Sequence, residues 1–239
     1  MNIDLYYDGV EIEKYHNYNN IKGFTTNISF MKEAGITDYN KFIHHCLKYN
    51  NHRPISFQVY EDEDEEIEKM TKKIFSIGQI YMATSDEYYN NIFVKIPIIK
   101  SNGLSNANII SKLHSENIQI NVTCIYTIDQ LVTLEKCFSR ETSVIISLFS
   151  GKINDTGKES NTIVKYAVNM FKSYPNIKIL WAACRTVYNI VEAAKQGAHI
   201  VTVPGSVLDR LGRYGQNLEQ QCLDCVKKFK KDSEDIILI

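Results

Sequence analysis

The chain has 239 residues and a formal net charge of −1, with 44% hydrophobic and 23% charged residues. These values are ordinary for a soluble globular protein made of one large α/β domain or two small ones. The near-zero net charge argues against a nucleic-acid partner and against binding to a membrane surface. No run of 18 apolar residues and no signal-peptide pattern occurs, so neither a membrane span nor secretion is expected.

Six cysteines are present, and Cys222 and Cys225 alone have CxxC spacing. No second pair and no nearby histidine completes a zinc site, so no metal is expected. Nothing in the sequence implies a nucleotide or an organic cofactor. Because cysteines in apolar or helical segments are typical of reduced thiols, a cytoplasmic location is expected.

Short apolar runs bounded by turn residues predict strands of a buried parallel sheet. In chain order these strands are Ile3–Tyr7, Lys22–Asn27, Pro54–Tyr60, Phe93–Pro97, Ile118–Ile125, Val144–Phe149, Lys178–Cys184 and His199–Pro204. Helices are predicted between them, at Val10–Tyr18, from Thr37 or Asp38 to Lys48, from the acidic run Glu61–Glu68 onward, and then at Leu104–Glu116, Asp129–Phe138, Asn161–Ser173, Val187–Gln196 and Ser206–Leu211.

This alternation predicts a single α/β domain, residues 1–239, folded as a (β/α)8 TIM barrel. Residues 216–239 add an amphipathic helix, Leu218–Lys231, and an apolar tail, Ile236–Ile239. A doubly wound open sheet is the alternative. It would need a GxGxxG or GxxxxGK[ST] loop after the first strand, and neither is present.

Lys95 is the one charged residue in the apolar run Phe93–Ile99. Burial disfavours the charged form of a lysine and lowers its pKa. A partly neutral lysine is a nucleophile that forms a Schiff base with a carbonyl substrate. The alternative is a structural lysine at a strand end whose ammonium reaches water.

Polar residues also interrupt the other predicted strands near their carboxyl ends. They are Asp8, Thr25, Thr26, Asn27, Ser56, Gln58, Asn121, Thr123 and Ser147, with Lys152 and Arg185 just beyond strands six and seven. Each of them alone is explained by a satisfied polar group in the core or by an ordinary surface cation. Because barrel active sites lie at the carboxyl ends of the strands, their arrival from six strands, together with Lys95 from a seventh, predicts one site.

The chemistry of these residues suits a lysine nucleophile. Asp8 is the one acid among them and is expected to exchange protons with substrate hydroxyls. Thr123 and Gln58 are candidates to hold a water that relays protons. Asn27 and Asn121 are candidates to fix substrate hydroxyls.

Lys152 and Arg185 are candidates to bind a phosphate group. Phosphate sites in barrels favour the last strands, and arginine binds phosphate through two hydrogen bonds.

Several blocks resemble the transaldolase family, including its short branch of fructose-6-phosphate aldolase-like enzymes. They are Gly23–Ser29, Val94–Pro97 with Gly103–Leu104, Ile120–Thr123, Ile146–Lys152, Ile179–Arg185 and Thr202–Pro204. The resemblance implies a class I aldol mechanism in which Lys95 carries the Schiff base and Asp8 is the base. It also implies ring-shaped homo-oligomers in which the C-terminal helix contacts a neighbouring subunit.

The resemblance further implies which residues bind the sugar: Asn27, Thr25, Ser56, Asn121, Ser147 and Phe149, with Lys152 and Arg185 on its phosphate.

Five positions depart from the family pattern. Gln58 stands where transaldolases carry a glutamate, and Phe149 stands where the aldolase branch has a tyrosine acid. With both present, neither known proton relay is complete. Ala183 replaces a phosphate-binding serine, Lys152 replaces an arginine, and Ile28 replaces a proline.

The leading hypothesis is a transaldolase that moves a dihydroxyacetone unit between sugar phosphates, as in pentose-phosphate metabolism. The alternatives are a fructose-6-phosphate aldolase-like lyase, an aldolase for an unphosphorylated sugar, and a sugar-phosphate-binding barrel with little catalysis. The partners expected are small sugars and further copies of the same chain.

Overall fold

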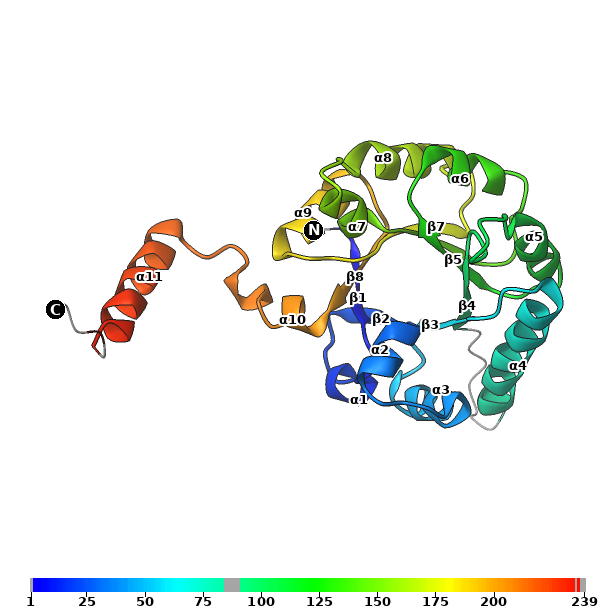
Figure 1. Ribbon diagram of the computed structural model, residues 1–239, viewed down its shortest axis with the longest axis horizontal. Helices are drawn as coiled ribbons and strands as arrows, with labels where there is room; N and C mark the ends of the chain where they lie inside the picture. Colours follow the sequence, from blue (N-terminus) through cyan, green and yellow to red (C-terminus); the bar gives the residue numbers. More distant parts are fainter. Residues whose placement is uncertain (1, 84–90, 235, 237–239) are drawn as a thin grey trace.

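The computed structural model describes residues 2–83, 91–234 and 236. Within them, eight parallel strands form a closed barrel in sequence order (Figure 1). The strands are β1 (Asp4–Asp8), β2 (Ile21–Thr25), β3 (Ile55–Gln58), β4 (Ile92–Pro97), β5 (Ile120–Ile125), β6 (Val144–Leu148), β7 (Ile177–Trp181) and β8 (Ile200–Pro204). The predicted (β/α)8 barrel is therefore confirmed.

Helices surround the barrel on the outside (Figure 1). In chain order the helices before the C-terminal segment are α1 (Ile12–Tyr15), α2 (Ile28–Glu33), α3 (Tyr39–Tyr49), α4 (Asp64–Ala83), α5 (Ala107–Ser115), α6 (Ile128–Leu134), α7 (Ser150–Asp155), α8 (Asn161–Met170), α9 (Val187–Lys195) and α10 (Gly205–Leu208). A 3-10 turn, η1 (Leu211–Arg213), and a separate helix, α11 (Leu218–Asp232), follow them.

Two short helices, α2 and α7, were not predicted, because six residues are too few to show helical periodicity. The predicted second strand was wrong at its end, since β2 stops at Thr25. Asn27 instead caps α2, and its side-chain oxygen accepts a hydrogen bond of 2.9 Å from the backbone N–H of Phe30. The helix predicted at Val10–Tyr18 shortens to α1.

Side chains alternate between two apolar layers. On β4, Val94 and Ile96 pack outward against the helices, while Phe93 points into the barrel. The interior layer consists of Tyr6, Phe93, Ile145, Leu180, Ala182 and Ile200. Burying each large apolar side chain stabilises the fold by about 1.5–3 kcal/mol. This layer closes the lower barrel, so the polar residues of the strands lie above it, toward the carboxyl ends.

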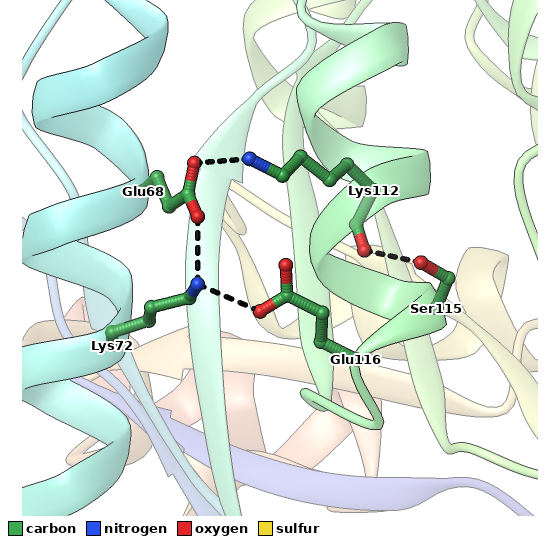
Figure 2. Close-up of polar contacts among 5 residues, drawn as sticks. All are labelled: Glu68, Lys72, Lys112, Ser115 and Glu116. Carbon is green, nitrogen blue, oxygen red and sulfur yellow. Dashed lines mark hydrogen bonds and ion pairs between the residues drawn. The ribbon is translucent and has the colours of Figure 1, made fainter.

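An ion-pair network joins α4 to α5 on the outside (Figure 2). Glu68 accepts hydrogen bonds from Lys112 at 2.5 Å and from Lys72 at 2.6 Å, and Lys72 also pairs with Glu116 at 2.9 Å. The hydrogen bonds from Lys112 and Lys72 lower the pKa of Glu68 to about 2. The predicted acidic run therefore starts α4 and links it to its neighbour.

Helix α11 stands away from the barrel (Figure 1), and none of its residues is buried. Leu218, Leu223, Val226 and Phe229 on this helix are all exposed. Ile236, the first residue of the predicted tail, is exposed too, and 237–239 lie outside the described residues. No helix in the described part of the chain has the length and apolar character needed to cross a membrane.

Candidate active site

A cavity of about 470 Å³ opens at the carboxyl ends of the barrel strands. It is lined by nine of the predicted site residues: Asp8, Thr25, Asn27, Gln58, Lys95, Ser147, Phe149, Lys152 and Arg185. Ala183, named above as a departure from the family pattern, also lines the cavity. The rest of the lining was not predicted: Ser29, Phe30, Cys124, Leu180, Ala182, Cys184, Thr202, Pro204 and Ser206. The topology thus gathers the predicted polar residues at one end of the barrel.

Lys95 lies on β4, lines this cavity and is 5% exposed. Its ammonium donates a hydrogen bond of 3.1 Å to the backbone carbonyl of Thr26. Burial lowers the pKa of Lys95, and the charge of Asp8 opposes that shift. This burial excludes the alternative of a lysine whose head group reaches bulk water.

Asp8, at the end of β1, is the acidic partner of Lys95 in the cavity. Its carboxylate accepts a 2.7 Å hydrogen bond from the hydroxyl of Thr25, which is 2.5 Å from the hydroxyl of Thr202. Burial raises the pKa of Asp8, while Lys95 and the Thr25 hydrogen bond lower it. Burial therefore pulls both members of the pair toward their neutral forms, which favours proton exchange between them.

Four of the predicted polar residues do not line the cavity, because their side chains are buried: Thr26, Ser56, Asn121 and Thr123. The Asn121 amide donates to Ser56 at 2.9 Å, and Ser147 donates to the Asn121 carbonyl oxygen at 2.7 Å. These bonds link β3, β5 and β6 across the interior. Ser56 and Asn121 thus hold Ser147 in the cavity wall, and direct contact of either with a substrate stays a prediction.

The two predicted cations enter the cavity from neighbouring elements. Lys152 is on α7, and its ammonium lies 5.5 Å from the centre of the Phe149 ring. Arg185 follows β7 and forms an ion pair of 2.9 Å with Asp155. The Asn189 side chain, in the capping box of α9, accepts from the Arg185 backbone N–H and fixes its position. An anion at this end would compete with Asp155 for Arg185.

A backbone feature joins α7 to the end of β7. A Cβ on Gly151 would lie 1.7 Å from the carbonyl oxygen of Ala183, so only glycine allows this approach. Ala183 itself has a φ of 59°, in the left-handed region. Such backbone strain occurs often at functional sites. Lys152 and Arg185, which are next to Gly151 and close to Ala183 in the sequence, are therefore positioned by this close contact between α7 and the segment after β7.

Cys124 is one of the lining residues that were not predicted from the sequence, and strand alternation argued against it. Alternation along β5 places Asn121 and Thr123 on the inner face and so assigns Cys124 to the outer one. The register of β5 with β6 shifts between Val122 and Ile125, and this irregularity turns Cys124 into the cavity. No sequence signal marks such a bulge.

As for metals, the described residues hold no cluster of three His, Cys, Asp or Glu side chains that could bind one.

Known proteins resemble this chain along most of its length. The family model described as transaldolase/fructose-6-phosphate aldolase matches residues 5–237. A probable transaldolase of Methanococcus maripaludis is 28% identical over 211 residues, which is 87% of this chain and 88% of that protein. A probable transaldolase of Nitrosopumilus maritimus is 30% identical over 212 residues, covering 84% of this chain and 82% of that protein.

Among solved structures, 2,3-dimethylmalate lyase, a member of the PEP mutase/isocitrate lyase superfamily, aligns with a TM-score of 0.54. The alignment covers 99% of this chain and 85% of that chain, at 10% sequence identity. This likeness concerns the barrel fold alone.

Proposed function

The chain belongs to the transaldolase/fructose-6-phosphate aldolase family and is an enzyme of the transaldolase type, and from this premise we propose that it transfers a dihydroxyacetone unit between sugar phosphates through a Schiff base on Lys95. The observation that carries the proposal is the burial of Lys95 beside Asp8 in a polar cavity. A barrel that only binds sugars would gain nothing from burying a lysine at that cost.

Lys95 begins the reaction. Because burial lowers its pKa, a larger fraction of the amine is neutral than for an exposed lysine. The neutral amine attacks the ketone carbon of the donor, and loss of water leaves an iminium ion. The iminium nitrogen then accepts the electrons of the carbon–carbon bond as that bond breaks.

Asp8 acts on the substrate hydroxyl whose proton must leave during that cleavage. Its carboxylate is fixed by the Thr25 hydroxyl, and Thr25 is held in turn by Thr202. Taking this proton releases the aldehyde product and leaves a three-carbon enamine on Lys95. The enamine adds to an acceptor aldehyde, and Asp8 returns the proton to the new hydroxyl.

Lys152 and Arg185 bind the phosphate at the far end of the donor. Arg185 has the planar group that suits two oxygens of a phosphate, while Lys152 supplies a single positive charge. The walls between the two ends carry Asn27 and Ser147, which suit the middle hydroxyls of a sugar. A cavity of about 470 Å³ has room for a donor of six or seven carbons.

A second candidate is an aldolase that releases the dihydroxyacetone unit from an unphosphorylated sugar. Two observations favour it: Ala183 has no hydroxyl for a phosphate, and Arg185 is already paired with Asp155. In that reaction the enamine is protonated and water hydrolyses the resulting iminium ion, so Lys95 is released without an acceptor aldehyde.

One assay separates the two functions. Purified protein is given a ketose phosphate donor with and without an aldose phosphate acceptor, and the products are followed by mass spectrometry. Transaldolase activity yields a new ketose phosphate only when acceptor is present. Equal donor cleavage without acceptor assigns the aldolase, and no consumption of any phosphorylated or free ketose contradicts both.

The partner of α11 is proposed to be a second copy of this chain. Leu218, Cys222, Cys225 and Phe229 recur at spacings of three and four residues and so form one stripe along an exposed helix. An unpaired apolar stripe on a helix that stands away from its own barrel requires a surface to cover it. The homo-oligomer implied by the family resemblance supplies one.

A further inference from the structure

The proposed reaction needs a proton at a place that Asp8 does not serve. Attack by Lys95 first gives a carbinolamine, whose hydroxyl must be protonated before it leaves as water. At the two positions where the family resemblance implies a glutamate or a tyrosine acid, this chain has Gln58 and Phe149. Neither side chain has a proton to give at neutral pH. The cavity must therefore supply the acid from another residue.

The Cys124 thiol lines this cavity and carries an ionisable proton that the steps described above do not use. Its backbone has a φ of 61°, in a region that residues other than glycine rarely adopt. The register shift that contains it adds a residue to β5 at the rim of the barrel. Bulges at barrel rims re-aim side chains toward active sites. As a result, Cys124 lines the same cavity as Lys95 and Gln58.

The surroundings of the thiol suit a proton donor. Burial raises the pKa of Cys124, and the charge of Lys95, the Thr123 hydroxyl and Lys152 lower it. The thiol therefore keeps its proton at neutral pH, but a positive charge on Lys95 favours its loss. The Thr123 hydroxyl is fully buried, and its hydrogen bond with the thiol favours the thiolate that forms when the proton leaves.

The other titratable groups of the cavity do not serve this step. The thiol of Cys184 donates to the backbone carbonyl of Thr186 at 3.3 Å, and Arg185 is paired with Asp155. The same cavity is lined by Lys95 on the neighbouring strand β4, by Asp8 on β1 and by Lys152 on α7, while Tyr126, on the segment of Cys124 itself, is outside the lining. Asp8 is committed to the substrate hydroxyl at the bond that breaks.

We propose that the Cys124 thiol is the acid and base that exchanges protons with the carbinolamine on Lys95. In the forward step, the S–H proton passes to the carbinolamine hydroxyl, the carbon–oxygen bond breaks, and water leaves. A neutral carbinolamine and a neutral thiol thus become an iminium ion and a thiolate, which attract each other. On hydrolysis, the thiolate takes a proton from the attacking water. This inference rests on the proposed Schiff-base function.

The test compares Cys124→Ala and Cys124→Ser with the wild-type protein and with Cys137→Ala. Cys137 bonds to backbone carbonyls outside the cavity, so it controls for the loss of a thiol as such. Protein mixed with a ketose phosphate is quenched with borohydride at successive times, and the trapped adduct is counted by intact mass. Thermal unfolding of each variant checks the fold.

Both Cys124 variants are expected to form the adduct about 100-fold more slowly, as for loss of a general acid. Donor affinity and the final adduct yield stay unchanged. In the wild type and in Cys137→Ala, the rate falls at alkaline pH as the thiol loses its proton, and this fall disappears in both Cys124 variants. Cys124→Ser preserves size and hydrogen bonding, so it stays informative if Cys124→Ala does not fold.

Adduct formation in Cys124→Ser at the wild-type rate, with the alkaline fall preserved, overturns the role of Cys124 and leaves the proposed function intact. A wild-type protein that gives no adduct with any ketose overturns both.

Discussion

Replacing Asp8 by Asn separates the two halves of the proposed reaction. Asn is nearly isosteric, and its carbonyl oxygen still accepts the 2.7 Å hydrogen bond from Thr25. What is lost is a negative charge that raises the pKa of Lys95 and a base that takes the substrate proton. The variant therefore changes charge and proton transfer while leaving the shape of the cavity in place.

The two losses act in opposite directions. Without Asp8 the pKa of Lys95 falls further, and each unit corresponds to about 1.36 kcal/mol and a tenfold larger neutral fraction of the amine below that pKa. Schiff-base formation near pH 7 is then at least as fast as in the wild type. Loss of a general base slows cleavage by about 10²–10⁴-fold, which is about 2.7–5.4 kcal/mol of barrier. Asp8→Asn is expected to accumulate the adduct on Lys95.

Steady-state donor consumption and the yield of borohydride-trapped protein are measured on the same preparation. Asp8→Asn is expected to lose turnover and to retain the adduct. Turnover within about threefold of the wild type would refute the base role of Asp8. Loss of both adduct and turnover, with unchanged thermal unfolding, would show that Asp8 serves Schiff-base formation instead.

Two further predictions concern phosphate and assembly. Asp155→Asn frees Arg185 from an ion pair in which both side chains are about half exposed. A surface ion pair of this kind contributes up to about 1 kcal/mol, so the KM for a phosphorylated donor is expected to fall by up to about fivefold. An unchanged KM, or an equal change for an unphosphorylated donor, contradicts competition at Arg185. Phe229→Asp on the stripe of α11 is expected to reduce the particle mass in light scattering, whereas Lys227→Asp on the opposite face leaves it unchanged. Equal masses for both variants count against the docking of α11.

The strands and the position of Lys95 were predictable because they depend on local patterns. An apolar run such as Phe93–Ile99 is buried by composition alone, and a closed barrel brings the carboxyl ends of its strands together. These two facts predict which residues lie near Lys95, including Asp8 at the carboxyl end of the first strand. No interatomic distance is needed for that prediction.

How deep each polar side chain lies in the barrel, and which side chain it pairs with, could not be predicted in the same way. Alternation shows that Asn121 and Ser56 face inward, but it does not show that they lie beneath the cavity and bond to each other. The Arg185–Asp155 pair joins residues 30 positions apart and depends on how α7 packs on β7. Cys124 changed faces because of one extra residue in β5, and a bulge leaves no periodic trace in the sequence.

The measurement that most directly tests the account is the location of the trapped adduct. Wild-type protein is incubated with a dihydroxyacetone-unit donor, reduced with borohydride, digested and mapped by mass spectrometry, with Lys95→Met as the matched control. We expect a mass added at Lys95 in the wild type and none in the variant. A reduced adduct on another lysine, or no adduct with any phosphorylated or free ketose, would contradict it.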